Sequence, residues 1–142
     1  MTESNQYRLS LHISHPSLAV SDIVRHFALP IRYSKSAGEK RKTKNGRELG
    51  GVYSKTDISF DVSGGVLSSE KYPFYDFIQS SFRDLPLNAI RSFVITGGEC
   101  FYLAGIYAES NFILYFPSNF LSVLSSSSIG MKLDFYGGRD FS

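Results

Sequence analysis

Hydrophobic and polar residues alternate at both ends of the chain. The apolar residues of segment 7–13 occupy every second position, and those of segment 131–136 do the same. A period of two predicts strands with one buried face and one polar face. Segments 31–36 and 50–62 carry the same pattern, and Lys44-Asn45-Gly46 marks a turn between them. We therefore expect four strands outside the apolar middle of the chain.

Other segments place apolar residues at helical spacing. In segment 74–85, five of them fall at i, i+3, i+4, i+8 and i+11, which is one continuous stripe. Pro73 suits the first turn of this helix, and Pro86 ends it. Shorter helices are predicted for three further segments, which are 21–27, 87–93 and 117–124.

Segments 101–108 and 112–116 are apolar on both parities, which is typical of central strands covered on both faces. The short polar turn 109–111 between them predicts that they pair as a hairpin. The expected order is β-α-β-β-α-(α)-β-β-α-β. This order predicts an α+β fold, with a mainly antiparallel sheet and helices packed on one side.

Length and composition agree with a single folded domain over residues 1–142, with an ordered core of about residues 7–136. The chain has 142 residues, of which 42% are hydrophobic and 20% charged, and this balance excludes a disordered protein. No apolar run approaches the roughly 20 residues that a membrane span needs. The first residues lack the basic and apolar regions of a secretory signal, so we expect a cytoplasmic protein.

Positive charge is concentrated in one part of the chain. Residues 1–71 carry 11 Lys and Arg against 7 Asp and Glu, a balance of +4, whereas residues 72–142 carry 4 against 6, a balance of −2. A patch of this kind attracts an anion or an acidic protein surface, or it is simply the solvated tip of a mobile hairpin. Its basic members are Arg32, Lys35, Lys40, Arg41, Lys42, Lys44 and Arg47.

The sequence contains no recognisable catalytic set. Cys100 precedes an apolar strand, and no helix N-terminus follows it to lower the pKa of its thiol. His12 and His15 have opposite parity on their strand, so they cannot bind one metal from one face. Asp57 and Asp61 lie about 13 Å apart by strand rise, which is too far for paired catalytic carboxylates. We therefore expect a non-enzymatic protein without a metal or a cofactor.

Three stretches resemble a known family. Residues 38–53 read G-E-K-R-K-T-K-N-G-R-E-L-G-G-V-Y, which is similar to the G-x-x-R-x-T-P-x-G-x-x-L-x-G-x-Y stretch of bacterial domain-of-unknown-function 4279 proteins, with Lys44 in place of the usual proline. Leu29-Pro30 and the ending 129–136 also resemble that family. The family has no established activity. Some members lie near secreted bacterial toxins, so the resemblance implies an immunity role.

Two binding functions follow as hypotheses. The first is a protein-binding module, an immunity (antitoxin-type) protein that occludes a cognate toxin with an acidic surface. The alternative is a small-ligand or anion-binding domain that recognises a phosphorylated metabolite or a nucleotide. Nucleic acid is not expected as a partner, since no helix-turn-helix, zinc-finger or basic-zipper pattern is present. The candidate binding residues are Lys40, Arg41, Lys42, Lys44, Arg47 and Tyr53.

A second candidate surface comes from the polar faces of the first and last predicted strands. If these faces lie on the same side of the sheet, they form a charged and partly open surface. Antiparallel sheets also expose one face simply to solvent, which is the alternative interpretation. The candidate residues on this face are Arg8, His12, Lys132, Asp134 and Tyr136.

Overall fold

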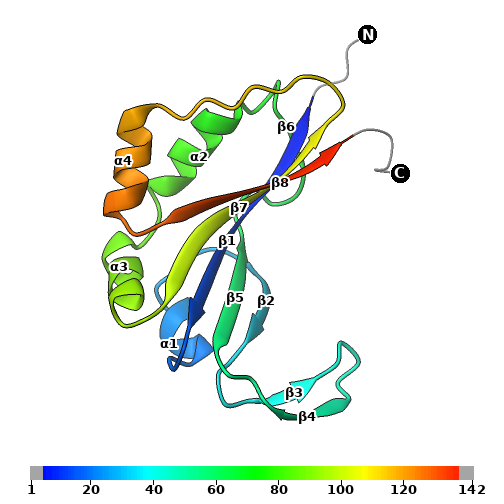
Figure 1. Ribbon diagram of the computed structural model, residues 1–142, viewed down its shortest axis with the longest axis vertical. Coiled ribbons are helices and arrows are strands. Elements are labelled where there is room, and N and C mark those ends of the chain that lie inside the picture. The colour runs from blue at the N-terminus through cyan, green and yellow to red at the C-terminus, as the bar shows by residue number, and fades with distance from the viewer. Residues whose placement is uncertain (1–4, 138–142) are drawn as a thin grey trace.

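A computed structural model describes residues 5–137 of the chain, and residues 1–4 and 138–142 lie outside this range. The described part has helices on one side of a mixed sheet and a hairpin that projects from it (Figure 1). The elements in chain order are β1 (Gln6–His15), α1 (Val20–Val24), β2 (Ile31–Lys35), β3 (Lys40–Lys42), β4 (Glu48–Val52), β5 (Thr56–Asp61), β6 (Leu67–Ser68), α2 (Phe74–Phe82), α3 (Leu87–Ile95), β7 (Glu99–Ala108), α4 (Ser118–Ser126) and β8 (Gly130–Gly137).

The main sheet has the strand order β2-β5-β1-β7-β8, and the short β6 also pairs with β1. Every pairing in it is antiparallel except that of β7 with β8, which is parallel. A parallel pair needs a crossover connection, and α4 lies in that connection. Strands β3 and β4 form a separate two-stranded sheet.

One hydrophobic core joins the sheet to all four described helices. The odd-numbered residues of β1, from Tyr7 to Ile13, are fully or almost fully buried, as the alternation predicts. Each helix contributes to the same core cluster, through Ile23 of α1, Ile78 of α2, Ile90 of α3 and Phe120 of α4. The structure therefore confirms the predicted α+β class, with a mainly antiparallel sheet.

Residues 112–116 do not form the predicted strand. They run as an extended, unpaired segment from the end of β7 towards α4 (Figure 1). Phe112, Leu114 and Phe116 pack against the core, whereas Ile113 and Tyr115 are exposed. Both edges of β7 are already occupied, by β1 and by β8. The predicted hairpin partner therefore has no free edge of β7 to pair with.

The predicted strand 50–62 is divided into two strands that belong to different sheets. Its first part is in β4, which pairs with β3, and its second part is β5, which pairs with β1 and β2. Gly50 and Gly51 both have positive φ, of 83° and 70°. Residues without a side chain adopt such φ values readily, so β4 can bend here, and residues 53–55 then connect it to β5 in the main sheet.

Candidate binding surface

Five of the seven basic residues lie on a hairpin that we call the basic hairpin, residues 38–53, whereas Arg32 and Lys35 belong to β2. Its tip is closed by two backbone hydrogen bonds, from the Thr43 N–H to the Arg47 carbonyl (2.8 Å) and from the Gly46 N–H to the Thr43 carbonyl (2.9 Å). All residues of β3 and β4 are exposed. The hairpin therefore presents its side chains to solvent on both faces.

Buried polar side chains fix the root of the basic hairpin to the domain. The hydroxyl of Thr56, which is fully buried, accepts a hydrogen bond from the Ala37 N–H (2.8 Å) and donates one to the Leu18 carbonyl. The hydroxyl of Ser36 accepts from the Val20 N–H at 3.0 Å. These bonds link the start of the hairpin to the segment around α1, so the hairpin leaves the domain in a defined direction.

Tyr53 holds the two sides of the hairpin together. Its N–H donates to the Glu39 carbonyl (2.9 Å), and its carbonyl accepts from the Gly38 N–H (3.0 Å). Its hydroxyl accepts a hydrogen bond from the Lys42 N–H at 3.2 Å. The ammonium group of Lys35 lies 5.5 Å from the centre of its ring. The candidate residue Tyr53 is thus also a structural residue of the hairpin.

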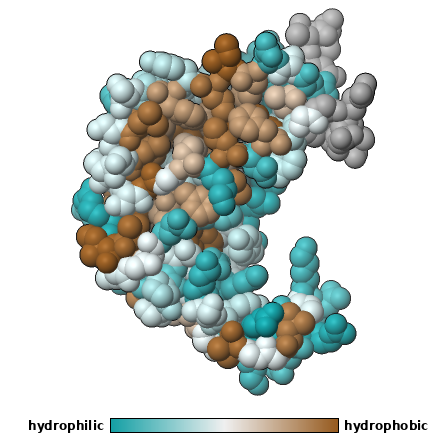
Figure 2. Space-filling model, in the orientation of Figure 1, coloured by the Kyte–Doolittle hydropathy of each residue, from teal (hydrophilic) through white to brown (hydrophobic). Residues whose placement is uncertain are grey.

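A cavity of about 1050 Å³ lies between the basic hairpin and β2. Figure 2 shows the hairpin standing away from the body of the molecule, with a hollow between them. Five cations against two carboxylates give the lining a net positive charge, although Lys40 and Glu48 are 3.6 Å apart and partly neutralise each other. The charged and aromatic lining residues are Arg32, Lys35, Lys40, Lys42, Lys44, Glu39, Glu48, Tyr33 and Tyr53.

The structure separates the predicted basic residues into two groups. Lys40, Lys42 and Lys44 line the cavity together with Tyr53, whereas Arg41 and Arg47 do not. The register of the hairpin shifts between Lys40 and Lys42, so Arg41 lies at an irregularity in the strand. A bulge of this kind redirects a side chain.

Exposed apolar side chains accompany the cations. Leu49 and Val52 of β4 are 48% and 55% exposed, and Ile31 of β2 is 46% exposed. Figure 2 shows hydrophobic and hydrophilic side chains next to each other on the hairpin. A two-stranded hairpin has no core in which to bury such residues. The hairpin therefore offers both apolar contact area and positive charge.

The strand registers place the second candidate surface on one face of the main sheet. His12 lies opposite Phe101, and Arg8 lies opposite Gly105. Residues Leu103, Gly105 and Tyr107 of β7 are in turn aligned with Lys132, Asp134 and Tyr136 of β8. The side chains of these positions point away from the helices, and we call this surface the open face. A binding role for it stays a prediction.

His12 lies at the centre of the open face. Its ring stacks on Phe101 with 5.2 Å between the ring centres, and the ammonium group of Lys132 lies 4.9 Å from the centre of the same Phe101 ring. The edge of Tyr33 approaches His12 from β2, at 6.3 Å. Burial, with the positive charges of Arg32 and Lys132, lowers the pKa of His12, and Asp57 acts in the opposite direction.

Two serine hydroxyls contact His12, but the arrangement does not favour nucleophilic catalysis. The Nε2 atom of His12 is 3.1 Å from the hydroxyl of Ser10 and 3.3 Å from that of Ser59. Both serines are buried, with 2% and 1% of their surface exposed. A nucleophile must reach the substrate as well as its base. The contacts instead hold the His12 ring in place on the sheet.

Tyr33 connects the open face to the basic hairpin. It lines the cavity between the basic hairpin and β2, and it also lines a smaller cavity of about 380 Å³ over the open face, which includes His12, Phe101 and Lys132. The sequence did not single out Tyr33 or Phe101. Their positions become informative only when the register shows which residues of distant strands are neighbours.

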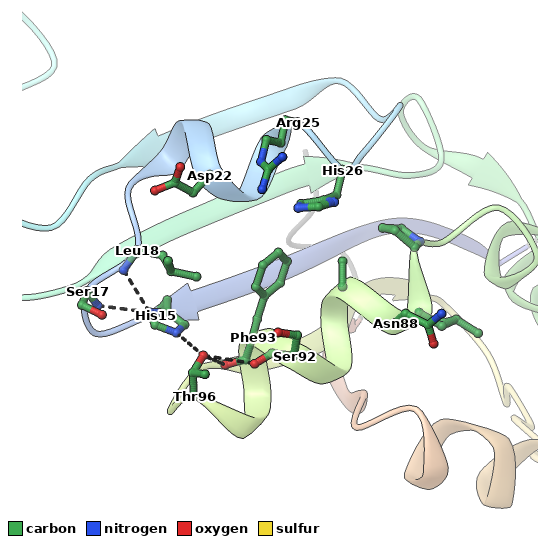
Figure 3. Close-up of a pocket in the computed structure, with 13 residues that line it drawn as sticks. His15, Ser17, Leu18, Asp22, Arg25, His26, Asn88, Ser92, Phe93 and Thr96 are labelled. Atoms are coloured by element: carbon green, nitrogen blue, oxygen red, sulfur yellow. Dashed lines mark hydrogen bonds between the residues drawn. The ribbon is translucent and has the colours of Figure 1, made fainter.

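A third concave surface lies between α1 and α3, with a volume of about 1100 Å³ (Figure 3). Nδ1 of His15 accepts hydrogen bonds from the N–H groups of Ser17 (3.1 Å) and Leu18 (3.0 Å). The proton of this buried ring is therefore on Nε2, which donates to the Thr96 hydroxyl at 2.8 Å. Burial lowers the pKa of His15.

The remaining polar lining of this groove comes mainly from α1 and α3. Asp22 of α1 lines the groove together with Arg25 and His26, which follow the helix (Figure 3), and His26 meets the edge of Phe93. Sequence reasoning did not find this groove, because its two walls are far apart along the chain. Its mixture of one carboxylate, one guanidinium and two imidazoles does not indicate a particular ligand.

Burial restricts the reactivity of the cysteine. Cys100 is 3% exposed, and burial raises the pKa of its thiol to about 12, so it is not a thiolate nucleophile at neutral pH.

Among residues 5–137, no three histidine, cysteine or acidic side chains are grouped as metal ligands would be. Within the same range, no helix has the length and apolar character needed to cross a bilayer.

Comparison of the chain with protein-family models, with curated proteins and with solved structures found no match. The resemblance to the domain-of-unknown-function 4279 family therefore stays a prediction that rests on the sequence motifs alone.

Proposed function

We propose that this protein is a non-enzymatic module that binds an acidic protein surface through the basic hairpin. The observation that carries the proposal is the composition of β3 and β4, whose exposed residues combine cations with apolar side chains. Long-range attraction between the net-positive cavity and an acidic partner increases the association rate. Apolar contacts with Leu49 and Val52 then slow dissociation of the complex.

The shape of the cavity favours a macromolecule over a small ligand. A small-molecule site usually encloses most of its ligand. Here the strands that supply most of the lining, β2, β3 and β4, are exposed along their whole length. A partner that inserts a convex acidic surface between the hairpin and β2 would contact both walls. Exposed Leu49 and Val52 add an apolar requirement that a free anion does not meet.

An immunity protein is the specific form of this function that we propose. Such a protein inhibits a toxin by covering its surface, so it needs a projecting and charge-complementary element but no catalytic group. The basic hairpin supplies such an element, and the resemblance described above supports the same role. The expected partner is a bacterial toxin with an acidic surface.

The test compares two variants with the same change in charge. Arg41, Lys42 and Lys44 are replaced together by Glu, and the control replaces Lys71, Arg83 and Arg91 by Glu. The wild-type chain is first used to capture its partner from the encoding organism, with the adjacent gene co-expressed. Affinity for the purified partner is then measured at several salt concentrations.

We expect the hairpin variant to bind at least about tenfold more weakly and to lose most of the salt dependence. The control variant should bind as the wild type does, because its substitutions lie outside the hairpin. Equal affinity and equal salt dependence for all three proteins would contradict the proposed surface. Toxicity of the partner that the wild-type chain does not suppress would contradict the immunity role.

The alternative function is recognition of a phosphorylated metabolite or a nucleotide in the same cavity. It is favoured by the proximity of the Lys35 ammonium group to the Tyr53 ring, since together they offer a charge and a stacking surface. A ligand of this class raises the melting temperature when it binds the folded state. A screen of phosphate-bearing metabolites that leaves the melting temperature unchanged would exclude this alternative.

A further inference from the structure

Strand β8 forms an open edge of the main sheet. Among the described residues its only strand neighbour is β7. On the outer side of β8, the backbone N–H and C=O groups therefore have no strand partner. Phe135 of this strand is 56% exposed, although it is a large apolar residue. An edge of this kind is a template for pairing with another strand.

The side chains of β8 are complementary to a second copy of the same strand. Consider two β8 strands paired antiparallel about a two-fold axis through Leu133. Lys132 then lies opposite Asp134 of the second copy, and Asp134 lies opposite Lys132 of the second copy, so both pairs have opposite charge. On the other face, Met131 lies opposite Phe135 of the second copy, and Leu133 lies opposite itself. Each pair of unlike residues occurs twice, as an isologous interface requires.

Charge also selects this register over its neighbours. A two-fold axis perpendicular to the sheet keeps each face on its own side, so the register can change only in steps of two residues. Each such step moves the axis by one residue along the strand. Centring on Lys132 would place two lysines opposite each other, and centring on Asp134 would place two aspartates opposite each other. Like charges directly opposite on paired strands are destabilising. The register centred on Leu133 avoids both arrangements.

The other open edge of the sheet lacks this complementarity. Strand β2 carries Arg32 and Lys35 but no acidic residue, so pairing with a copy of itself would bring only positive charges together. Pairing through β8 also leaves β2 and the basic hairpin free, because β2 and β8 are opposite edges of the sheet. Self-association and partner binding would therefore use different surfaces.

We propose that two copies of this protein associate through β8, which joins their main sheets through one antiparallel junction. The junction covers Phe135 and satisfies the outer backbone groups of both strands. The resulting dimer presents two basic hairpins, one at each end of the extended sheet. Dimerisation through β8 does not depend on the proposed function of the hairpin.

The test uses two single charge reversals, Lys132→Asp and Asp134→Lys, and measures mass by sedimentation over a range of protein concentrations. The wild type is expected to dimerise as its concentration rises. In a dimer of either single variant, positions 132 and 134 would carry the same charge and lie opposite each other twice. The dimer dissociation constant should therefore rise about tenfold or more. When the two variants are mixed, every Asp again faces a Lys, and a heterodimer is expected to form.

Two controls show whether the dimer interface lies at β8. Lys71→Asp makes the same charge change outside β8, and it should dimerise as the wild type does. The double variant Lys132→Asp/Asp134→Lys restores complementarity within one chain and should also dimerise. Thermal unfolding verifies that each variant is folded. A wild type that stays monomeric at its highest soluble concentration would overturn the proposal, as would a mixture of folded single variants that fails to associate.

Discussion

His12 and His15 are three residues apart in the sequence, and yet they have different roles in the structure. His12 lies on the open face, where its ring stacks on Phe101. His15 lies on the helix side, where both ring nitrogens form hydrogen bonds. Strand parity correctly predicted that they point to opposite faces. The parity did not show that His15 links the turn into α1 to the end of α3, because Thr96 comes from a distant part of the chain.

The first prediction concerns stability below neutral pH. Burial lowers the pKa of His15 in the folded state, so the unfolded chain binds the proton more readily. Stability that is present above the ordinary histidine pKa of about 6.5 should therefore be lost as the pH falls below that value. His12 contributes in the same direction. Urea unfolding between about pH 8 and pH 5 measures this loss.

A His15→Asn variant isolates the contribution of His15. The Asn side-chain oxygen can still accept from the Ser17 and Leu18 N–H groups, but the bond to Thr96 is lost. We expect the variant to be less stable by about 1 kcal/mol above pH 7, with a shallower fall in stability on acidification. A pH dependence as steep as that of the wild type would contradict this account of His15.

The second prediction concerns Gly98, at the turn from α3 into β7. A Cβ atom placed there would lie 2.7 Å from the Ser14 carbonyl oxygen and 2.8 Å from that of Phe93. Backbone atoms cannot move aside as a flexible side chain can. Gly98→Ala should therefore reduce the free energy of unfolding by about 1–3 kcal/mol or more. Calorimetry of this variant measures the effect.

Gly137→Ala is the matched control for this substitution. Its Cβ would meet no described atom within 4 Å, and no positive φ constrains the residue. It should change stability by less than about 0.5 kcal/mol. Similar effects of the two substitutions would show that crowding does not explain the requirement for Gly98.

At the level of elements, the helices were easier to predict than the strand pairings. Segment 74–85 shows its apolar stripe within one stretch of sequence, and α2 forms there. Segment 112–116 has an equally strong apolar pattern, but it does not become a strand. A helix satisfies its own backbone groups, whereas a strand needs an open edge on another strand. For residues 112–116, the structure offers no such edge on β7.

The third prediction concerns the root of the basic hairpin. Thr56→Val keeps the shape of this buried side chain but removes its hydroxyl, so the Ala37 N–H and the Leu18 carbonyl both lose their partner. We expect a loss of about 1–3 kcal/mol in the free energy of unfolding. Ser54→Val also replaces a hydroxyl side chain by Val, but at an exposed position nearby, and it serves as the control for the substitution itself.

The same substitution should also affect the hairpin more than the rest of the sheet. Backbone amides of residues 36–53 should exchange hydrogen faster in Thr56→Val than in the wild type. A variant with lower global stability but unchanged hairpin exchange would show that Thr56 contributes to the core alone.

For the whole molecule, the fold divides into a cooperative core and a projecting arm. Strands β1 and β7 are paired on both sides, and their inward side chains are buried. Strands β3 and β4 pair only with each other, and all of their residues are exposed. Local opening is least costly where little apolar surface is buried. The hairpin should therefore open without unfolding of the main sheet.

Hydrogen exchange provides the fourth prediction. Amides in the middle of β1 and β7 should exchange only through global unfolding, and those of β3 and β4 should exchange by local opening at a much lower free-energy cost. Binding of the proposed acidic partner should slow exchange in the hairpin selectively. Equal protection of β1 and β3 in the free protein would show that the hairpin belongs to the same cooperative unit.

By itself, the sequence determined the features that depend on neighbouring residues. These include the two faces of β1 and β8, the three helices α2, α3 and α4, and the gathering of positive charge in residues 32–47. Periodicity and turn residues act over short distances, so a single sequence is enough to reveal them. From these local features the α+β class could be predicted.

Only the tertiary structure decided which distant segments meet. It paired β8 parallel to β7, placed Tyr33 beside both His12 and the basic hairpin, and formed the groove between α1 and α3. Pairings of this kind depend on which edges and apolar faces remain open once the other elements have packed. That competition involves the whole chain, and no local pattern records its outcome.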